Sequence, residues 1–296
     1  MSVNNENILV STEWVADNIN NPSVIIVETS TDLNSTYIKG HIPNSIGWDI
    51  NIHLKHPIHR DIPTISQYKN LMDSSGISNN STVILYGDGK NRSATWTYWI
   101  MKLFSHNDVR IMNGGRYKWI KEKRDLVTTI SNSTKTNYKP YQLNTSIRAT
   151  QEYVREKLND PNCQIIDTRT YEEFAGLLTA SPGHKQPEIE QKGHIPNAIH
   201  IPWDDVITKN EQFPSISILK KLYESHNIDI NKEIITYCRL GHRASLTWYI
   251  LKYILKSPNV RVYDGSWTEW GNSIGMPIKK IGNYETLIYG LEKLIF

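Results

Sequence analysis

The stretch YCRLGHRAS, residues 237–245, gathers the residue types that covalent sulfur chemistry needs. Cys238 is one of only two cysteines in 296 residues, and the six residues from Cys238 to Arg243, the cysteine loop, include two arginines and a histidine. The thiolate is the nucleophilic form of cysteine, and neighbouring positive charge favours it. The sequence therefore predicts a nucleophilic cysteine in a loop that also binds anions.

The segments on either side of the cysteine loop would position the sulfur. EIITY, just before it, is a short apolar run of the kind that forms a buried parallel strand. We expect a buried helix to begin at about Ala244, after the loop has turned through Gly241. The apolar residues at helical spacing in that stretch are Ala244, Trp248, Leu251 and Leu255.

This arrangement would direct several N–H groups at one point. Loop amides and the first free N–H groups of a helix attract negative charge, and the helix dipole adds to that effect. We therefore expect the Cys238 thiol to ionise more readily than a free thiol. The residues predicted to surround the sulfur and the substrate are Arg239, Leu240, Gly241, His242 and Arg243.

The chain contains two copies of one unit. GHIPNS at Gly40 recurs as GHIPNA at Gly193, an offset of 153, and NGGRYKW recurs as YDGSWTEW at an offset of 151. Further upstream, EWVADNINNPSVIIVETS recurs as EYVREKLNDPNCQIIDTR at an offset of 139. Because the anchors keep the same order, the pattern indicates a duplication.

The change of offset predicts an insertion of about 14 residues in the second copy, in a loop at residues 177–192. Residues 128–146 are rich in Ser, Thr and Asn and are predicted to be a linker. We therefore predict an N-terminal domain at residues 8–127 and a C-terminal, catalytic domain at residues 147–296.

Each copy alternates between helical and strand patterns. A short helix is expected after Thr12 and after Thr150, both good N-cap residues. The apolar runs VIIV and TVILY in the first copy, and QII and EIITY in the second, suit strands that are covered on both faces. The predicted fold class is α/β, with two tandem domains that are each a small parallel sheet with helices on both faces.

Composition and charge exclude several classes of protein. The net charge is +3, from 33 basic and 30 acidic residues, without a run of Lys or Arg, so we expect no nucleic-acid partner. The start, MSVNNENILV, lacks the features of a signal peptide, and we find no apolar run long enough to cross a bilayer. We therefore expect no membrane partner, a cytoplasmic location and two reduced cysteines.

The motifs YCRLGHRAS, GHIPNS with GHIPNA, DTRTYEEFAG and YDGSWTEWG, set in a duplicated frame, resemble those of the two-domain rhodaneses, the thiosulfate sulfurtransferases. The resemblance extends over about residues 8–285. It implies two tandem rhodanese-like domains and a ping-pong reaction without metal or organic cofactor. In that reaction Cys238 takes the outer sulfur of thiosulfate as a persulfide and passes it to cyanide or to a thiol.

The length of the cysteine loop separates this interpretation from related cysteine phosphatases, whose arginine lies one residue further from the cysteine. Arg239 favours thiosulfate, because family members that use 3-mercaptopyruvate usually have Gly at that position. Vertebrate-type rhodaneses have Lys where this chain has Leu240 and Arg where it has Glu173. The substrate is therefore less firmly predicted than the reaction.

The first copy has Gly87, or Asp88 if the register slips by one, at the position of Cys238, and no cysteine precedes Cys163. By resemblance it is the family's inactive domain. Within HPIHRD we expect Arg60 to contact the substrate. The predicted partners are a small anionic sulfur donor and a thiophilic acceptor, and the protein is expected to be a monomer.

Other candidate residues receive structural interpretations. Cys163 lacks a charged loop and is expected to pack in the core. His41 and His194 occur in both copies, including the one without a nucleophile, so we expect structural hydrogen bonds there. Asp167 and Arg169 are expected to brace the end of a strand.

Three other functions stay open. The protein could use 3-mercaptopyruvate as its donor instead of thiosulfate. It could be a relay that carries a persulfide toward tRNA thiolation or cofactor biosynthesis. It could also be a binding module without catalytic activity, in which case Cys238 would not accept sulfur.

Overall fold

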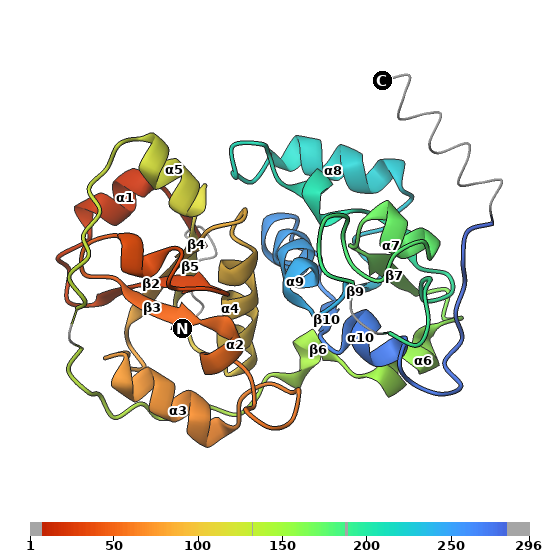
Figure 1. Ribbon diagram of the computed structural model, residues 1–296, viewed down its shortest axis with the longest axis horizontal. Helices are drawn as coiled ribbons and strands as arrows, with labels where there is room; N and C mark the ends of the chain where they lie inside the picture. The colour runs from red at the N-terminus through yellow and green to blue at the C-terminus, as the bar shows by residue number, and fades with distance from the viewer. Residues whose placement is uncertain (1–7, 132, 187–188, 283–296) are drawn as a thin grey trace. The chain divides into compact units, whose positions relative to one another are not determined.

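The structure is a computed structural model that describes residues 8–131, 133–186 and 189–282 (Figure 1). These residues form two compact units, divided at Thr145. The first unit also includes Ile207–Ser215, and the second resumes at Ile216. Each unit is a single parallel sheet with helices on both faces, so the predicted α/β class and the duplication are confirmed.

The sheet of the first unit has the strand order β1-β5-β4-β2-β3, with every neighbouring pair parallel. Its strands are β1 (Leu9–Val10), β2 (Val24–Ser30), β3 (Ile46–Asp49), β4 (Thr82–Gly87) and β5 (Val109–Met112). Its helices are α1 (Thr12–Asp17), the 3-10 helix η2 (Tyr37–Lys39), α2 (Ile50–His53), α3 (Ile65–Ser74), α4 (Arg92–Leu103) and α5 (Gly115–Lys121).

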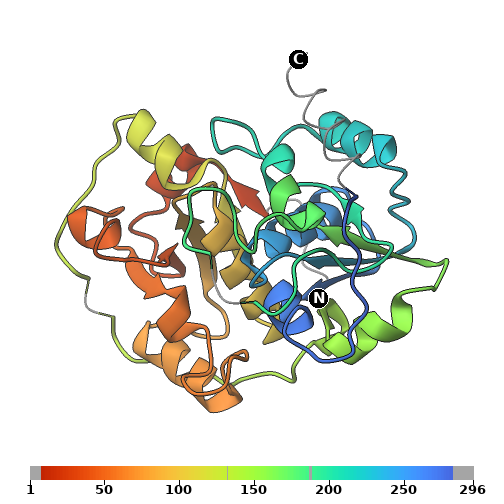
Figure 2. The same cartoon turned by 45° about the vertical axis from the view of Figure 1, so that its right-hand side comes forward.

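The sheet of the second unit repeats this topology in the order β6-β10-β9-β7-β8, again with parallel neighbours. Its elements run from yellow-green to blue in Figure 2. Its strands are β6 (Arg148–Ala149), β7 (Cys163–Asp167), β8 (Ile199–His200), β9 (Glu233–Tyr237) and β10 (Val260–Tyr263). Its helical elements are η3 (Thr145–Ile147), α6 (Gln151–Lys157), α7 (Tyr171–Ala175), η4 (Trp203–Val206), α8 (Ile216–Ser225), α9 (His242–Tyr249), the π-helix η5 (Ile250–Ile254) and α10 (Ser266–Trp270).

The strands of the second unit are apolar throughout because helices cover both faces of the sheet. On one face, Ile235 and Tyr263 pack with Trp267 and Trp270 of α10. On the other face, α9 contacts β9 and β10, and the indole N–H of Trp248 donates to the carbonyl oxygen of Val260 at 3.0 Å. A strand covered in this way shows no polar alternation, as the sequence predicted.

Three predicted helix starts can be compared with the structure. Thr150 is the N-cap of α6, as predicted, and its hydroxyl accepts from the amide of Tyr153. The N-cap of α1 is Ser11 and not Thr12, which is already helical. The helix after Cys238 begins at His242, before the predicted Ala244, because the polypeptide completes its turn at Gly241.

Part of the predicted linker lies on the first unit. Tyr138 is fully buried there, its amide donates to Asp73 at 2.6 Å, and its hydroxyl is hydrogen-bonded to His106 at 3.0 Å. The hydroxyl of Thr136 donates to the carbonyl oxygen of Ile77 at 2.6 Å. These contacts explain why the segment groups with the first unit despite its polar composition. The predicted domain boundaries stay a prediction, and the last of them lies outside the described residues.

Buried polar residues brace the strand ends next to the cysteine loop. Arg169 forms an ion pair of 2.7 Å with Asp167, donates to the carbonyl oxygen of Gly193 at 2.6 Å and lies over the ring of Trp267. The hydroxyl of Tyr237 donates to Asp167 at 2.6 Å. Burial opposes ionisation of Asp167, but the charge and hydrogen bonds of Arg169 outweigh it and lower the pKa of the carboxyl group. The predicted bracing role of Asp167 and Arg169 is thus supported.

The first unit braces its sheet with an arginine from a different element. Arg116 of α5 forms an ion pair of 2.8 Å with Glu28 and donates to the carbonyl oxygen of Gly40 at 2.5 Å. Tyr86 takes the place of Tyr237 in register, since it pairs with Glu28 as Tyr237 pairs with Asp167. Both units therefore fix the Gly-His-Ile-Pro turn to a buried carboxylate, although the arginines come from different parts of the fold.

Two stacked ring pairs show where the insertion lies. His41 stacks on Tyr37, and its Nδ1 hydrogen-bonds to the carbonyl oxygen of Tyr37 at 2.7 Å; His194 makes the same contacts with Phe174, at 2.8 Å. His41 follows Tyr37 by 4 positions, whereas His194 follows Phe174 by 20, so the second unit has 16 more residues between them. The net gain over the stretch is the expected 14, because the chain before Phe174 is two residues shorter than its counterpart. The histidines are structural, as expected.

Candidate active site

Cys238 directly follows β9, the central strand of the second sheet, at its carboxyl end. Its side chain is a free thiol that is 1% exposed. Two backbone amides of the cysteine loop donate to its sulfur, from Leu240 at 3.4 Å and from Gly241 at 3.1 Å. The loop thus presents N–H groups to the sulfur, as the sequence predicted, and such groups favour a thiolate or an anion bound beside it.

Gly241 allows the loop to close. It is the N-cap of α9 and has φ of 91°, in the left-handed region, and its carbonyl oxygen accepts the first helical hydrogen bond from Ser245. A residue with a Cβ is strained in that conformation, whereas glycine is not. The left-handed turn lets the Gly241 amide reach the sulfur just before the helix begins.

A second segment, at the start of α10, forms hydrogen bonds with the backbone of the cysteine loop. The hydroxyl of Ser266 accepts from the amide of Cys238 at 3.1 Å and donates to the carbonyl oxygen of Tyr263 at 2.7 Å. The amide of Trp267 donates to the carbonyl oxygen of Cys238 at 3.0 Å, and the hydroxyl of Thr268 donates to that of Arg239 at 2.7 Å. This role could not be predicted from the sequence, although YDGSWTEW is one of the repeated segments.

Arg243 is the buried cation of the loop, and Glu173 is its partner. The guanidinium group donates from Nη1 to Glu173 Oε2 at 2.6 Å and from Nη2 to Glu173 Oε1 at 2.9 Å. Burial works against charge on either group, but the hydrogen bonds and mutual attraction raise the pKa of Arg243 and lower the pKa of Glu173. The resemblance implied only that Glu173 stands where vertebrate-type rhodaneses have an arginine; the structure shows that Glu173 binds an arginine.

The other predicted contact residues occupy different environments. Arg239, Leu240 and His242 are half-buried in the cysteine loop next to Cys238. Arg60 is exposed in the first unit, and its contact with the substrate stays a prediction. The structure therefore brings together the five predicted residues of the loop.

Cys163 lies in a different environment from Cys238. It begins β7, is partly buried and packs against the apolar cluster formed with Ile165 and Ile235. Burial, with the negative charge of Glu233, raises the pKa of the Cys163 thiol to about 12. A thiol that stays protonated at neutral pH is a poor nucleophile, which supports the predicted packing role.

The first unit has a modified version of the same loop. Gly87 occupies the position of Cys238, because it pairs with Thr29 one step beyond the pair of Glu28 with Tyr86. The side chain of Asn91 accepts from the amide of Gly87 at 3.1 Å and donates to the carbonyl oxygen of Met112 at 2.9 Å. The Asn91 side chain thus takes the place of the Ser266 hydroxyl, which in the second unit accepts from the amide of Cys238 and donates to the carbonyl oxygen of Tyr263.

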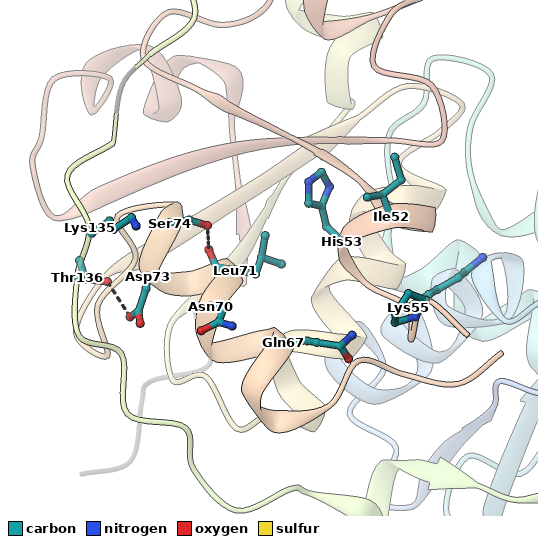
Figure 3. Close-up of a pocket in the computed structure, with 11 residues that line it drawn as sticks. Ile52, His53, Lys55, Gln67, Asn70, Leu71, Asp73, Ser74, Lys135 and Thr136 are labelled. Carbon is teal, nitrogen blue, oxygen red and sulfur yellow. Dashed lines mark hydrogen bonds between the residues drawn. The ribbon is translucent and has the colours of Figure 1, made fainter. Parts of the chain in front are cut away.

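A pocket in the first unit does not offer an alternative site for sulfur chemistry. It has a volume of about 570 Å³ and lies beside α2 and α3, with His53, Lys55, Gln67 and Lys135 among its lining residues (Figure 3). Asp73, at one end, accepts a hydrogen bond from Thr136 (Figure 3). No cysteine lines this pocket.

The part of the chain that the structure describes holds no group of three or more His, Cys, Asp or Glu side chains that could bind a metal ion. Nor does any helix in those residues have the length and apolar character to span a bilayer. Neither finding bears on Cys238 itself.

Comparison with known proteins places this geometry in a family. The family model of the rhodanese-like domain matches residues 11–122 and 150–273, which are the two copies of the duplicated unit. The chain belongs to the rhodanese family. It is 40% identical to the sulfur carrier protein TtuD of Thermus thermophilus over 276 residues, covering 92% of this chain and 96% of that one. It is 38% identical to a protein of Saccharopolyspora erythraea named as a putative thiosulfate sulfurtransferase, over 93% and 96% of the two chains.

Solved structures agree on the fold. An EanB variant in complex with ergothioneine superimposes with a TM-score of 0.82 at 23% identity, covering 93% of this chain and 70% of that one. Wild-type EanB superimposes with a TM-score of 0.81. At this level of identity the likeness concerns the fold alone, and the tandem rhodanese architecture is confirmed by the two matches to the family model.

Proposed function

We propose that the protein is a sulfurtransferase that carries sulfur as a persulfide on Cys238. One observation carries the proposal: the Cys238 sulfur lies at the carboxyl end of the central strand and accepts two backbone N–H groups, at 3.4 and 3.1 Å. The names of the Thermus thermophilus and Saccharopolyspora erythraea relatives, a sulfur carrier and a putative thiosulfate sulfurtransferase, support the same chemistry.

The proposed donor is thiosulfate, and the reaction takes two steps. The Cys238 thiolate attacks the outer sulfur of thiosulfate, the S–S bond breaks, and sulfite leaves with the electron pair. The thiolate of an acceptor, or cyanide, then attacks the terminal sulfur of the Cys238 persulfide, and the Cys238 thiolate is restored. This is covalent catalysis, in which one difficult transfer is divided into two easier ones.

The loop assists both steps through electrostatics. Negative charge is present on the sulfur before the first step and on the persulfide after it. Amides of Leu240 and Gly241 already point at this charge, so little reorganisation is needed when the reaction occurs. Arg239 favours thiosulfate over 3-mercaptopyruvate by resemblance, and the absence of a cofactor, the monomeric state and the cytoplasmic location stay predictions.

Intact-protein mass spectrometry tests the proposal. We expect thiosulfate to add the mass of one sulfur atom to the protein and 3-mercaptopyruvate to do so only at higher concentration. Cys238→Ser should abolish the gain, whereas Cys163→Ser, the matched control, should retain it. If the wild-type protein gains no sulfur from either donor, the protein is not a sulfurtransferase for these donors, and the non-catalytic interpretation is favoured.

A persulfide relay is the second candidate, favoured by the name of the Thermus thermophilus relative. In that function a protein desulfurase would supply the sulfur, and thiosulfate would be a donor only in vitro. Loading rates distinguish the two candidates. Transfer from a cysteine desulfurase that is much faster than transfer from thiosulfate would favour the relay.

A further inference from the structure

The guanidinium group of Arg243 has acceptors among the described residues for three of its five N–H donors, and its Nε–Nη2 edge, here called the open edge, carries the other two. Its end edge, Nη1 and Nη2, binds both oxygens of Glu173, and Nη1 also donates to the hydroxyl of Ser181 at 3.1 Å. Arginine has five N–H donors, and the described residues supply no acceptor for the Nε–H and for one Nη2–H of Arg243. These two donors lie on the same edge of the planar group, so they form a fork that matches two oxygens of an anion.

Ser181 belongs to the insertion that only the second unit carries. Its hydroxyl is also 3.3 Å from Glu173 Oε2, so it contacts both members of the ion pair. The side chain of Gln186 fixes this part of the loop, because its oxygen accepts from the amides of Thr179 at 2.9 Å and Ala180 at 2.8 Å. Residues 177–186 are therefore anchored to the cysteine loop through Ser181.

The first unit provides a comparison within the same chain. It lacks the insertion, and Thr36 precedes Tyr37 where Glu173 precedes Phe174 in the second unit. Arg92, 151 positions before Arg243, donates from Nε to the carbonyl oxygen of Gly89 at 3.0 Å. The Nε–H that Arg243 keeps open is thus occupied in Arg92. The carboxylate, the insertion and the open edge occur together in the unit that has the cysteine.

We propose that the insertion takes part in donor binding through Ser181, which together with Glu173 orients Arg243 so that its Nε–Nη2 edge binds the anionic oxygens of the sulfur donor. The proposal rests on the proposed function, and it assigns a role to the insertion. Ser181 acts through Arg243 and is a positioning residue. The donor class that this edge selects is a small sulfur compound with at least two adjacent anionic oxygens, such as a thiosulfonate.

Alkylation of Cys238 by two reagents of different charge tests the orientation of Arg243. Iodoacetate carries a carboxylate and iodoacetamide does not, so the ratio of their rates at one pH reports anion binding and cancels the fraction of thiolate. We expect Ser181→Ala to lower this ratio about fivefold, the value of one hydrogen bond of average strength. Ser181→Thr, which keeps the hydroxyl, should restore it. His184→Ala is the matched control, because His184 is exposed in the same loop.

The ratio for N-acetylcysteine in solution is the reference, and peptide mapping assigns the label to Cys238. Gln186→Ala, which loosens the loop without touching the ion pair, should also lower the ratio. If the ratio of iodoacetate to iodoacetamide rates in Ser181→Ala and in Gln186→Ala equals the ratio in His184→Ala, the proposal is overturned. Circular dichroism and melting temperature confirm that each variant is folded.

Thiosulfate kinetics provide the second measurement. Ser181→Ala should raise the KM for thiosulfate by about the same factor and leave kcat nearly unchanged, because the open edge binds oxygens that do not react. A change in kcat alone would contradict the positioning role. If the wild-type protein accepts no sulfur, the proposed function fails, whereas the alkylation ratio still decides whether Ser181 controls anion binding at Cys238.

Discussion

Replacing Glu173 by Gln tests how the buried ion pair with Arg243 is stabilised. Glu173 is 0% exposed and Arg243 is 7% exposed, so the substitution leaves a buried guanidinium charge without its counter-charge. Removing one partner of a buried pair costs about 3–5 kcal/mol. The Gln oxygen still accepts one N–H, which recovers roughly 1 kcal/mol. We therefore expect Glu173→Gln to lower the free energy of unfolding of the second unit by about 2–4 kcal/mol.

Differential scanning calorimetry can measure this loss. For a unit of this size we expect the melting temperature of its transition to fall by roughly 5–10 °C. Glu172→Gln is the matched control: it removes the same charge from the neighbouring residue, which is half-buried and outside the ion pair. If Glu173→Gln destabilises the protein no more than Glu172→Gln, the ion pair does not stabilise the site and the reasoning is refuted.

The pH dependence of the difference provides a second check. Arg243 lowers the pKa of Glu173 in the folded protein below its ordinary value of 4.5, although burial opposes this. The stabilisation is then fully present above about pH 4.5 and is lost as the pH falls through the folded-state pKa. The difference in the free energy of unfolding between wild type and Glu173→Gln should stay constant from pH 7 to pH 5 and become smaller below pH 4.5. If this difference in the free energy of unfolding grows on acidification, the pKa of Glu173 is not lowered by folding and the reasoning is refuted.

Two other predictions concern the loop and the second cysteine. Gly241→Ala should lower the free energy of unfolding in urea by about 1–2 kcal/mol, because the left-handed turn strains a residue with a Cβ. It should also slow persulfide loading, because the amide that contacts the sulfur is displaced. A variant with wild-type stability and a wild-type loading rate would argue against the role of this turn. Cys163, whose pKa is raised to about 12, should react with iodoacetamide at pH 8 at least about a hundredfold more slowly than N-acetylcysteine. Peptide mapping measures the rate at Cys163. Comparable rates for the two thiols would show that burial does not keep the Cys163 thiol protonated.

Local patterns predicted most of the fold. The apolar runs before Gly87 and Cys238 became central parallel strands, because a strand between two layers of helices must be apolar on both faces. The repeated Gly-His-Ile-Pro turns located the duplication, since each turn is tied to a buried carboxylate in its own unit. Helix starts were less well predicted, by one residue at Thr12 and by two at Ala244, because a cap depends on backbone angles that composition does not specify.

The candidate nucleophile could be identified from its neighbours in the chain. Cys238, Gly241 and Arg243 lie within six residues, so their proximity follows from covalent spacing alone. The support from Ser266 could not be predicted in this way, because it comes from the start of another helix 28 positions further on. The repeat of YDGSWTEW in both copies was the only signal of its importance.

From its order of residues alone, this chain was identified as two copies of an α/β unit with a single candidate nucleophile, because periodicity, repeats and a short loop are local properties. Only the tertiary structure decided which residues bind and balance the charge of Arg243. Glu173 and Ser181 lie 70 and 62 positions from Arg243, yet they bind its guanidinium group from two sides. A salt bridge between such distant residues forms because folding buries both charges together. The spacing of these residues along the chain therefore does not predict the contact.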